Sequence, residues 1–421
     1  MRKAVLHAAD AGRRVADALH RADVGFTAGK HTVHLSPTSR LFVVGLGKAA
    51  PAMCNAAAAT LGSLIHRGIA AVPEGTTAPA PDRMTFFTCG HPQPDEGSLA
   101  SGLAIEAMLA ETTPEDVVLT LVSGGGSAML EIPVAGISLS DLRELTTALL
   151  RSGAPIHEIN IIRSALSLTK SGGLARLAAP ARSVALILSD VVGNRLSSIA
   201  SGPTVLRATQ PRRAVRILHK YNLWKKNPQS VRNALTTHRS PPMPTPRPVN
   251  ILIASNHVVI DAAQTAATGM GFPVHVLSRQ MHGEARDVGH RFASRMAHTG
   301  GPECLIMGGE TTVRVRGGGR GGRNQELAIS AAIRLDGRPG AALMALATDG
   351  VDGPTDAAGA IVTGDTAAMA RDAGLDLEAA LDDNNAYPSL NRLGALIRTG
   401  PTGTNLNDIV VGLVYPVRGA A

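Results

Sequence analysis

Short apolar runs alternate along the chain with segments long enough to form helices. Most of these runs end at Gly, Ser or Asp, and they lie at residues 40–47, 67–74, 116–126, 183–190, 249–255, 272–278, 303–310 and 342–350. Nearly continuous apolar character is typical of strands that are buried on both faces of a parallel sheet. Because helical segments separate most of the runs, the pattern predicts an α/β protein whose N-terminal part is a Rossmann-like parallel sheet.

Two later runs, 311–317 and 408–417, alternate in polarity or are longer, and we interpret them as antiparallel strands of a smaller, mixed α/β domain. A proline-rich stretch, "HRSPPMPTPRPVN" (238–250), separates the two halves of the chain. Prolines hold the backbone in a stiff, extended conformation. The sequence therefore predicts an N-terminal domain at 1–240, a hinge at 241–248 and a C-terminal domain at 249–421.

The composition narrows the class of protein. A chain of 421 residues is too long for one ordinary core, and 44% apolar with 18% charged residues is a globular composition. Aromatic residues make up only 2%, which argues against a nucleic-acid binder that stacks bases. The net charge of +8 fits either a small anionic ligand or an inert basic surface. No apolar stretch is long enough to span a membrane, and the N-terminus lacks a secretory signal, so a cytoplasmic protein is expected.

Two glycine-containing turns follow predicted strands and precede helices. "VVGLGKAAPAM" (43–53) places Lys48 directly after a Gly-x-Gly turn. "LTLVSGGGSAML" (119–130) contains Ser123, Gly124, Gly125, Gly126 and Ser127 in succession. Backbone N–H groups in such turns can bind phosphate oxygens. A purely structural turn is the alternative, and it fits the first stretch as well as an anion site does; the three glycines of the second stretch favour an anion site.

The segment 157–175 is predicted to be a helix with a polar face. Asn160, Arg163, Ser167 and Lys170 are spaced by three or four residues, which would place them on one side of that helix. A solvated helix face is the alternative reading. Because the face is poor in acidic residues, an anion-binding surface is favoured slightly.

Carboxylates follow strands in both halves of the chain. Asp190 ends the run 183–190, while Asp349, Asp352 and Asp356 lie within "ALATDGVDGPTDAAGA" (345–360). At the end of a parallel strand, an aspartate can bind magnesium or accept a proton, although helix capping is a common alternative.

Glycine and arginine are concentrated in "GGETTVRVRGGGRGGRNQEL" (308–327). We interpret this stretch as a loop whose amides, with Arg320 or Arg323, close on phosphate or carboxylate oxygens. Cationic loops combined with carboxylates are what phosphoryl transfer requires, since positive charge must face the transferred group and a base or orienting group must face the accepting hydroxyl.

Taken together and in order, these motifs resemble the type II glycerate kinases, whose C-terminal part is called the MOFRL domain. The resemblance extends from about residue 40 to 415 and includes "GLGKAAPAM", "GHPQPDEGS", "LVSGGGSAML", "INIIRSALSLTKSGGLA", "IASGPT", "GGRNQEL", "TDGVDGPTDAAGA" and "TGPTGTNLNDIVVGL". It implies ATP-dependent phosphorylation of D-glycerate to 2-phosphoglycerate, with Mg²⁺. It also implies two α/β domains with the active site in the cleft between them.

The resemblance also implies roles for individual residues. Lys48, Asp190 and Arg323 would be catalytic, with Asp190 also the metal ligand. Residues that would bind substrate or phosphate are Ser123, Gly124, Gly125, Gly126, Ser127, Asn160, Arg163, Lys170, Glu310, Asn324, Glu326, Asp349 and Asp352. In the hypothetical mechanism, Lys48 lies near the transferred phosphate, Arg323 holds the glycerate carboxylate, and Asp190 or Asp349 acts on the 2-hydroxyl. The family often has "SDVPGD", where this chain has Val192 and Asn194, so a second acid is missing here.

An NAD(P)H-dependent hydroxypyruvate reductase is the alternative function, because some family members carry that older name. The Gly-x-Gly turn at 45–47 is followed by Lys48 and alanines rather than by a full dinucleotide fingerprint, which disfavours a reductase. Neither nucleic acid nor a membrane is an expected partner. The sequence leaves open the choice between the 2- and the 3-hydroxyl, the nucleotide and any homo-oligomer.

Overall fold

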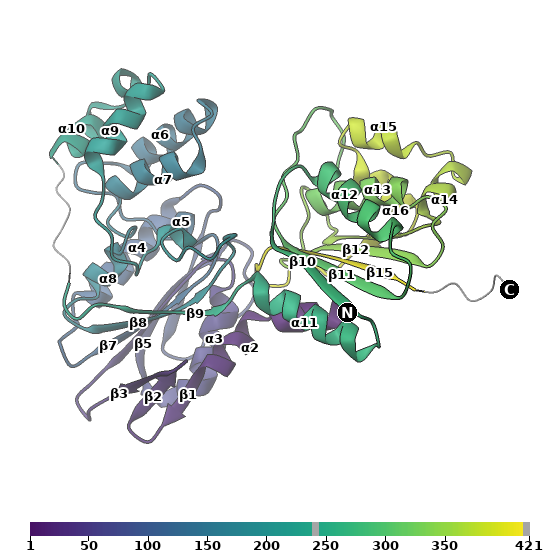
Figure 1. Cartoon of the computed structure of the whole chain (residues 1–421). Helices are drawn as coiled ribbons and strands as arrows, with labels where there is room; N and C mark the ends of the chain where they lie inside the picture. Colours follow the sequence, from purple (N-terminus) through teal and green to yellow (C-terminus); the bar gives the residue numbers. More distant parts are fainter. Residues whose placement is uncertain (238–243, 416–421) are drawn as a thin grey trace. The chain divides into compact units, whose positions relative to one another are not determined.

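The computed structural model describes residues 1–237 and 244–415, and these form two compact units (Figure 1). One unit contains Ala11–Ser189 and Asn194–Ile253; the other contains Met1–Asp10, Asp190–Gly193 and the chain from Ala254 onward. These units differ from the predicted domains in three ways. The first ten residues and Asp190–Gly193 belong with the C-terminal unit, and residues 249–253 belong with the N-terminal sheet. Part of the predicted hinge, 241–243, lies outside the described residues. The hinge and the cleft between domains stay predictions.

The first unit is built on a six-stranded sheet in the order β6-β5-β4-β7-β8-β9. Its strands in chain order are β4 (Leu41–Leu46), β5 (Ile65–Pro73), β6 (Met84–Cys89), β7 (Val117–Val122), β8 (Arg182–Leu188) and β9 (Val249–Ala254). The pairs β6/β5, β5/β4, β4/β7 and β7/β8 are all parallel. Every residue of β4 and β7 is buried, as the continuous apolar runs predicted.

The order of these strands is that of a Rossmann fold, because β4 is followed outward by β5 and β6 on one side and by β7, β8 and β9 on the other. The direction of winding reverses between β4 and β7. Ligands of open α/β sheets bind at the carboxyl ends of the strands beside such a reversal. The loops after β4 and β7 are therefore the expected location of a ligand-binding site.

The remaining elements of this unit are helical, apart from a small antiparallel sheet. That sheet, β1 (Leu19–Ala22), β2 (Gly25–Ala28) and β3 (His31–His34), was not predicted. The helices include α2 (Ala11–Ala18), α3 (Ala50–Leu61), α4 (Glu96–Leu109), α5 (Gly126–Met129) and α8 (Gly173–Leu177). A separate apolar core joins α6 (Leu139–Arg151), α7 (Ile156–Ala165), α9 (Pro211–Lys220) and α10 (Gln229–Thr237), which Figure 1 shows as one group.

The second unit contains a mixed sheet in the order β10-β11-β15-β12-β13-β14. Its strands are β10 (Val274–Met281), β11 (Glu303–Gly309), β12 (Ala341–Ala347), β13 (Gly359–Thr363), β14 (Leu396–Ile397) and β15 (Asp408–Val414). Only β10 and β11 pair in parallel, and β15 lies antiparallel between β11 and β12. The strand predicted at 408–417 is thus confirmed as antiparallel over residues 408–414, and 416–417 lie outside the described residues.

The strand predicted at 311–317 is wrong. That segment forms a single bridge between Glu284 and Thr312, and Val315 is 75% exposed, so its alternating pattern does not bury one face. The helices of this unit are α1 (Arg2–Ala9), α11 (Asn256–Gly269), α12 (Ala285–Ala297), α13 (Arg323–Arg334), α14 (Thr366–Asp372), α15 (Leu377–Asp382) and α16 (Ala386–Arg392). In both units, none of the described helices is both long and apolar enough to cross a bilayer.

A buried carboxylate ties together the starts of three central strands in the first unit. Asp116 accepts hydrogen bonds from the Arg40 backbone N–H (2.8 Å), the Arg40 guanidinium (2.7 Å) and the Thr113 backbone N–H (2.9 Å). Its own carbonyl accepts from the Arg182 N–H (3.0 Å) at the start of β8. Burial alone would raise the pKa of Asp116, but these donors lower it to about 2.

We therefore expect Asp116→Asn to lower the free energy of unfolding by about 2 kcal/mol at pH 7. The carboxylate stabilises the fold above its ordinary pKa of 3.8, and this stabilisation is lost as the pH falls through about 2. Urea unfolding at pH 7 and below pH 4 measures the effect, with the exposed Asp82→Asn as the matched control. A difference between Asp116→Asn and wild type that stays constant down to the lowest pH would contradict this account.

Candidate active site

The loops after β4 and β7 are packed directly on each other at the reversal point of the sheet. The Lys48 N–H donates to the Gly124 carbonyl (2.8 Å), and the Ala49 N–H donates to the Ser123 hydroxyl (3.0 Å). Gly47 has a φ of +106°, and a Cβ there would lie 2.4 Å from the Ser123 carbonyl oxygen. Only glycine fits at this contact, which fixes where Lys48 leaves the sheet.

The turn of the second loop collects further polar groups. Gly125 has a φ of +83°, so it too favours glycine. The Ser127 hydroxyl lies 2.8 Å from the Ser201 hydroxyl, and the Arg163 guanidinium donates to the Ser127 carbonyl (3.1 Å). Lys48, Gly125 and Ser127 are all half-buried. The structure thus brings Lys48, Ser123–Ser127 and Arg163 together.

The predicted helix over 157–175 is wrong beyond Ala165. Helix α7 ends there because the next residues pair with another segment: the Leu166 carbonyl accepts from Val134, and the Leu168 N–H donates to Ile132. Asn160 lies half-buried on α7, one turn before Arg163. Ser167 and Lys170 are outside the helix, so the four residues do not share one helical face.

Lys170 is buried in an ion pair. Its ammonium lies 2.6 Å from Glu131 Oε2, and both side chains are at most 2% exposed. Burial lowers the pKa of Lys170 to about 8, while the Glu131 carboxylate opposes that change. In this arrangement Lys170 supports the segment behind the loop of β7 and does not present its charge to an external phosphate.

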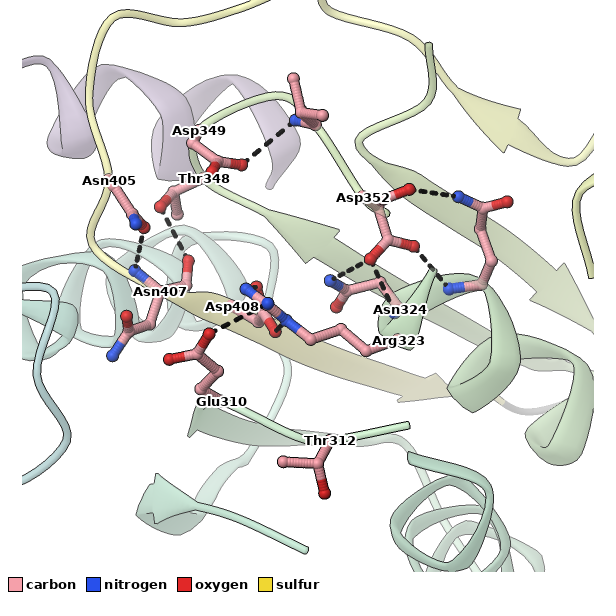
Figure 2. Close-up of polar contacts among 12 residues, drawn as sticks. Glu310, Thr312, Arg323, Asn324, Thr348, Asp349, Asp352, Asn405, Asn407 and Asp408 are labelled. Atoms are coloured by element: carbon pink, nitrogen blue, oxygen red, sulfur yellow. Dashed lines mark hydrogen bonds and ion pairs between the residues drawn. The ribbon is translucent and has the colours of Figure 1, made fainter. Parts of the chain in front are cut away.

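In the second unit, Arg323 lies between two carboxylates at the start of α13 (Figure 2). Its Nε and Nη2 donate to Asp408 (2.5 and 3.0 Å), and its Nη1 forms an ion pair with Glu310 Oε1 at 2.9 Å. Asp408 is fully buried, whereas Glu310 is 43% exposed. Burial raises the pKa of the Asp408 carboxyl to about 7, against the opposing charge of Arg323. The contact of Arg323 with buried Asp408 is therefore fixed by the fold, whereas Glu310, which is exposed, could be replaced at Arg323 by another carboxylate.

Asp352 caps helix α13 from within the same unit. Its carboxylate accepts from the backbone N–H groups of Asn324 (3.0 Å) and Gln325 (2.9 Å) and from the Asn324 amide (3.2 Å). Burial raises the pKa of Asp352, while these donors oppose the change. Because a carboxylate of the chain already occupies this helix terminus, an external phosphate would have to displace it. Asp349, which is half-buried nearby, accepts from the Val351 N–H (3.1 Å).

The glycine- and arginine-rich loop is pinned to residues 383–385, which contradicts its interpretation as an open phosphate cradle. Asn384 Oδ1 accepts from the N–H groups of Arg316 (2.6 Å) and Gly317 (3.1 Å), and Asp383 accepts from Gly318 and Gly319. The Arg320 N–H donates to Asn385, and its guanidinium lies 4.5 Å from the Tyr387 ring centroid. These amides are occupied by side-chain and backbone oxygens of the chain itself.

The same segment explains Glu326. This buried carboxylate accepts from the Asn384 amide (2.5 Å), and burial raises the pKa of Glu326 although Asn384 opposes the change. Glu326 thus positions Asn384, which in turn binds the glycine- and arginine-rich loop. These contacts indicate a structural role for Glu326 rather than direct contact with a ligand.

The donor set for magnesium is sparse. In the part of the chain that the structure describes, no three His, Cys, Asp or Glu side chains are grouped as a metal cage. Asp190 follows β8 and is half-buried, as is Asp349 after β12. Buried Asn324 Oδ1 has no hydrogen-bond partner among the described residues. Such a set fits Mg²⁺ that is held mainly by phosphate oxygens and water, with one or two protein ligands.

Comparisons with known proteins agree with this architecture. Residues 1–236 match the family described as "Domain of unknown function (DUF4147)", and residues 303–408 match the MOFRL family. The chain is 40% identical to a D-glycerate 2-kinase of Thermotoga maritima over 92% of this chain and 94% of that protein. The crystal structure of a glycerate kinase from the same organism superposes with a TM-score of 0.88 at 38% identity, covering 98% of this chain and 97% of the other.

The chain belongs to the glycerate 2-kinase family. A relative from Agrobacterium vitis that is 39% identical, over 89% of this chain and 87% of that protein, is named a putative hydroxypyruvate reductase. The older name therefore occurs within the glycerate 2-kinase family.

Sequence reasoning missed Asp408 and Asn384 in this glycerate 2-kinase family member. Asp408 is the first residue of the apolar run of β15, and a carboxylate that directly precedes a buried central strand is a signal that could have found it. Asn384 has a φ of +54°, which no sequence pattern near it indicates. Both residues act on groups far away in the sequence, so spacing alone does not reveal them.

Gly319→Ala should destabilise the second unit by about 2 kcal/mol, because a Cβ there would lie 2.4 Å from the Asn385 Cβ and 2.5 Å from the Asp383 carbonyl oxygen. Gly318→Ala is the matched control, since nothing lies within 4 Å of its Cβ position. Thermal unfolding compares the two. If Gly319→Ala instead kept its stability and lost nucleotide affinity, the loop would be a phosphate cradle after all.

Lys170→Met should cost about 3–5 kcal/mol of unfolding free energy, because it leaves the Glu131 carboxylate buried and unpaired. The double variant Lys170→Met with Glu131→Leu should regain most of that stability. Chemical unfolding of the single and double variants tests the pair. Normal stability in Lys170→Met combined with weakened substrate binding would instead support the direct phosphate role.

Proposed function

We propose that the chain catalyses transfer of the γ-phosphoryl group of ATP to D-glycerate, at the 2-hydroxyl, giving 2-phosphoglycerate and ADP. Membership of the glycerate 2-kinase family supports this reaction. The observation that carries it is the position of Lys48 beside the Ser123–Ser127 turn, at the reversal point of the parallel sheet. A cation and a glycine turn at that point are suited to a phosphate group.

Lys48 and Arg163 supply positive charge in the first unit. Phosphoryl transfer spreads negative charge over the equatorial oxygens of the transferred group, so a cation fixed by the fold lowers the barrier. The backbone of Lys48 is fixed by the bond from its N–H to Gly124, and Arg163 is anchored to Ser127. Mg²⁺ would be held by Asp190 or Asp349 together with phosphate oxygens, and it would neutralise charge on the nucleotide.

Arg323 is proposed to bind the glycerate carboxylate. Two of its nitrogens are held by buried Asp408, which leaves Nη1 and its contact with Glu310 to exchange. An exposed ion pair is worth only about 0–1 kcal/mol, so a substrate carboxylate can replace Glu310 at small cost. Asp190 or Asp349 then orients the 2-hydroxyl or accepts its proton.

The reductase alternative is less well supported by the loop after β4. In a dinucleotide site, the pyrophosphate approaches the glycines of this loop closely. In this protein the Ser123 carbonyl oxygen lies 2.4 Å from the position that a Cβ on Gly47 would occupy. The space beside Gly47 is therefore filled by the protein's own backbone. A full dinucleotide fingerprint is also missing from the sequence.

The decisive assay measures ADP release with D-glycerate and magnesium ATP, with the product identified by NMR. We expect Lys48→Met to lower kcat about 100-fold or more, because it removes the cation near the transferred phosphate. The exposed Lys30→Met is the matched control and should keep wild-type turnover. Near-normal turnover of Lys48→Met would remove Lys48 from the mechanism. NADH oxidation with hydroxypyruvate, without ADP release, would favour the reductase.

A further inference from the structure

The loop that follows β6 carries His91, and this residue lies beside the Gly125 turn of the β7 loop. His91 follows β6, and its loop is fixed from two sides. Asp95 caps α4 by accepting from the Ser98 N–H (2.9 Å), and its carboxylate lies 3.0 Å from the Cβ position of Gly90. Arg143 of α6 donates to the Pro94 carbonyl (2.6 Å). The backbone that carries His91 is therefore held in place without help from the imidazole.

The imidazole of His91 lies beside Lys48 at the turn of the β7 loop. His91 Cδ2 and Lys48 Cγ are each 3.2 Å from the position that a Cβ on Gly125 would occupy. His91 is exposed, and within residues 1–237 and 244–415 no hydrogen bond is made by its ring. The polar groups of the ring are thus available at the place where Lys48, Arg163 and the Ser127 hydroxyl converge.

The environment keeps this ring neutral near pH 7. Partial burial of the ring, and then the charge of Lys48, lower the pKa of His91. A neutral imidazole has one N–H donor and one acceptor nitrogen. Beside the Lys48 ammonium, a neutral ring can donate a directional hydrogen bond without adding a further positive charge.

We propose that His91 is a substrate-contacting residue, which donates a hydrogen bond to an anionic oxygen held over the Gly125–Ser127 turn next to Lys48. This inference rests on the proposed function and assigns a further residue to its site. The oxygen belongs either to a phosphate of the nucleotide or to the carboxylate of the hydroxy acid. Both have the same hydrogen-bond chemistry, and the experiment separates them.

The kinetic test compares His91→Leu, which removes the donor, with His91→Gln, which keeps an N–H donor. We expect His91→Leu to raise the KM for one substrate, or to lower kcat, by about 10-fold or more, and His91→Gln to recover part of that loss. The KM that changes identifies the source of the oxygen. His20→Leu, at another exposed histidine of the same unit, is the matched control and should behave as wild type.

The binding test needs no turnover. The ring signals of His91 in the wild-type protein, identified by their absence in His91→Gln, are followed by NMR during separate titrations with inorganic phosphate, ADP and D-glycerate. A saturable shift with at least one of these ligands supports the contact. No shift with any of them, together with wild-type kinetics of His91→Leu, overturns it.

Two further outcomes separate the explanations. Equal losses of melting temperature in His91→Leu and His91→Gln, with kcat and KM unchanged for the folded fraction, would show a structural role and overturn the proposal. If wild-type protein releases no ADP with D-glycerate and ATP, the proposed function fails, and the NMR titration alone then decides whether His91 contacts an anion.

Discussion

The first unit depends on the contact between the loops that follow β4 and β7. Gly47 leaves no room for a side chain against Ser123, and the Lys48 N–H binds the Gly124 carbonyl, so the two loops have one relative position. Parallel strands bring their carboxyl ends to one edge, but this close backbone approach determines what that edge presents. Lys48, Arg163 and the Ser127 hydroxyl share a small region because the loops cannot separate without breaking these contacts.

The second unit uses its own carboxylates where an anion site was expected. Asp352 occupies the amides at the start of α13, Asp383 and Asn384 occupy those of the glycine-rich loop, and Asp408 holds Arg323. Gly317 and Gly319 have a packing cause, because residues 383–385 lie too close for side chains at these two positions. A loop rich in glycine and arginine before a helix is therefore not enough to indicate a phosphate site, because side chains of the protein itself can occupy its backbone N–H groups.

The sequence predicted the parts of the fold in which one physical signal dominates. Strands buried on both faces, such as β4 and β7, need continuous apolar runs, and such runs can be recognised in the amino-acid sequence. The small sheet β1–β3 was missed because its short strands mix exposed and buried residues. Lys170 was misplaced since helical spacing says nothing about the pairing of 166–168 with 132–134, which ends the helix. The residues predicted beside the glycine turns lie together in the structure, whereas Asp408 binds Arg323 across 85 residues of sequence and was not predicted.

The place of β15 in the second sheet has a consequence for biosynthesis. It is the last strand of this sheet in chain order, yet it lies between β11 and β12 and pairs with both. Until the ribosome has translated residues 408–414, those two strands have exposed hydrogen-bonding edges and no common partner. The first sheet, complete by Ala254, can fold during synthesis, whereas the second must wait. Because Asp408 opens β15, the nascent chain orients Arg323 in the same late step that completes the sheet.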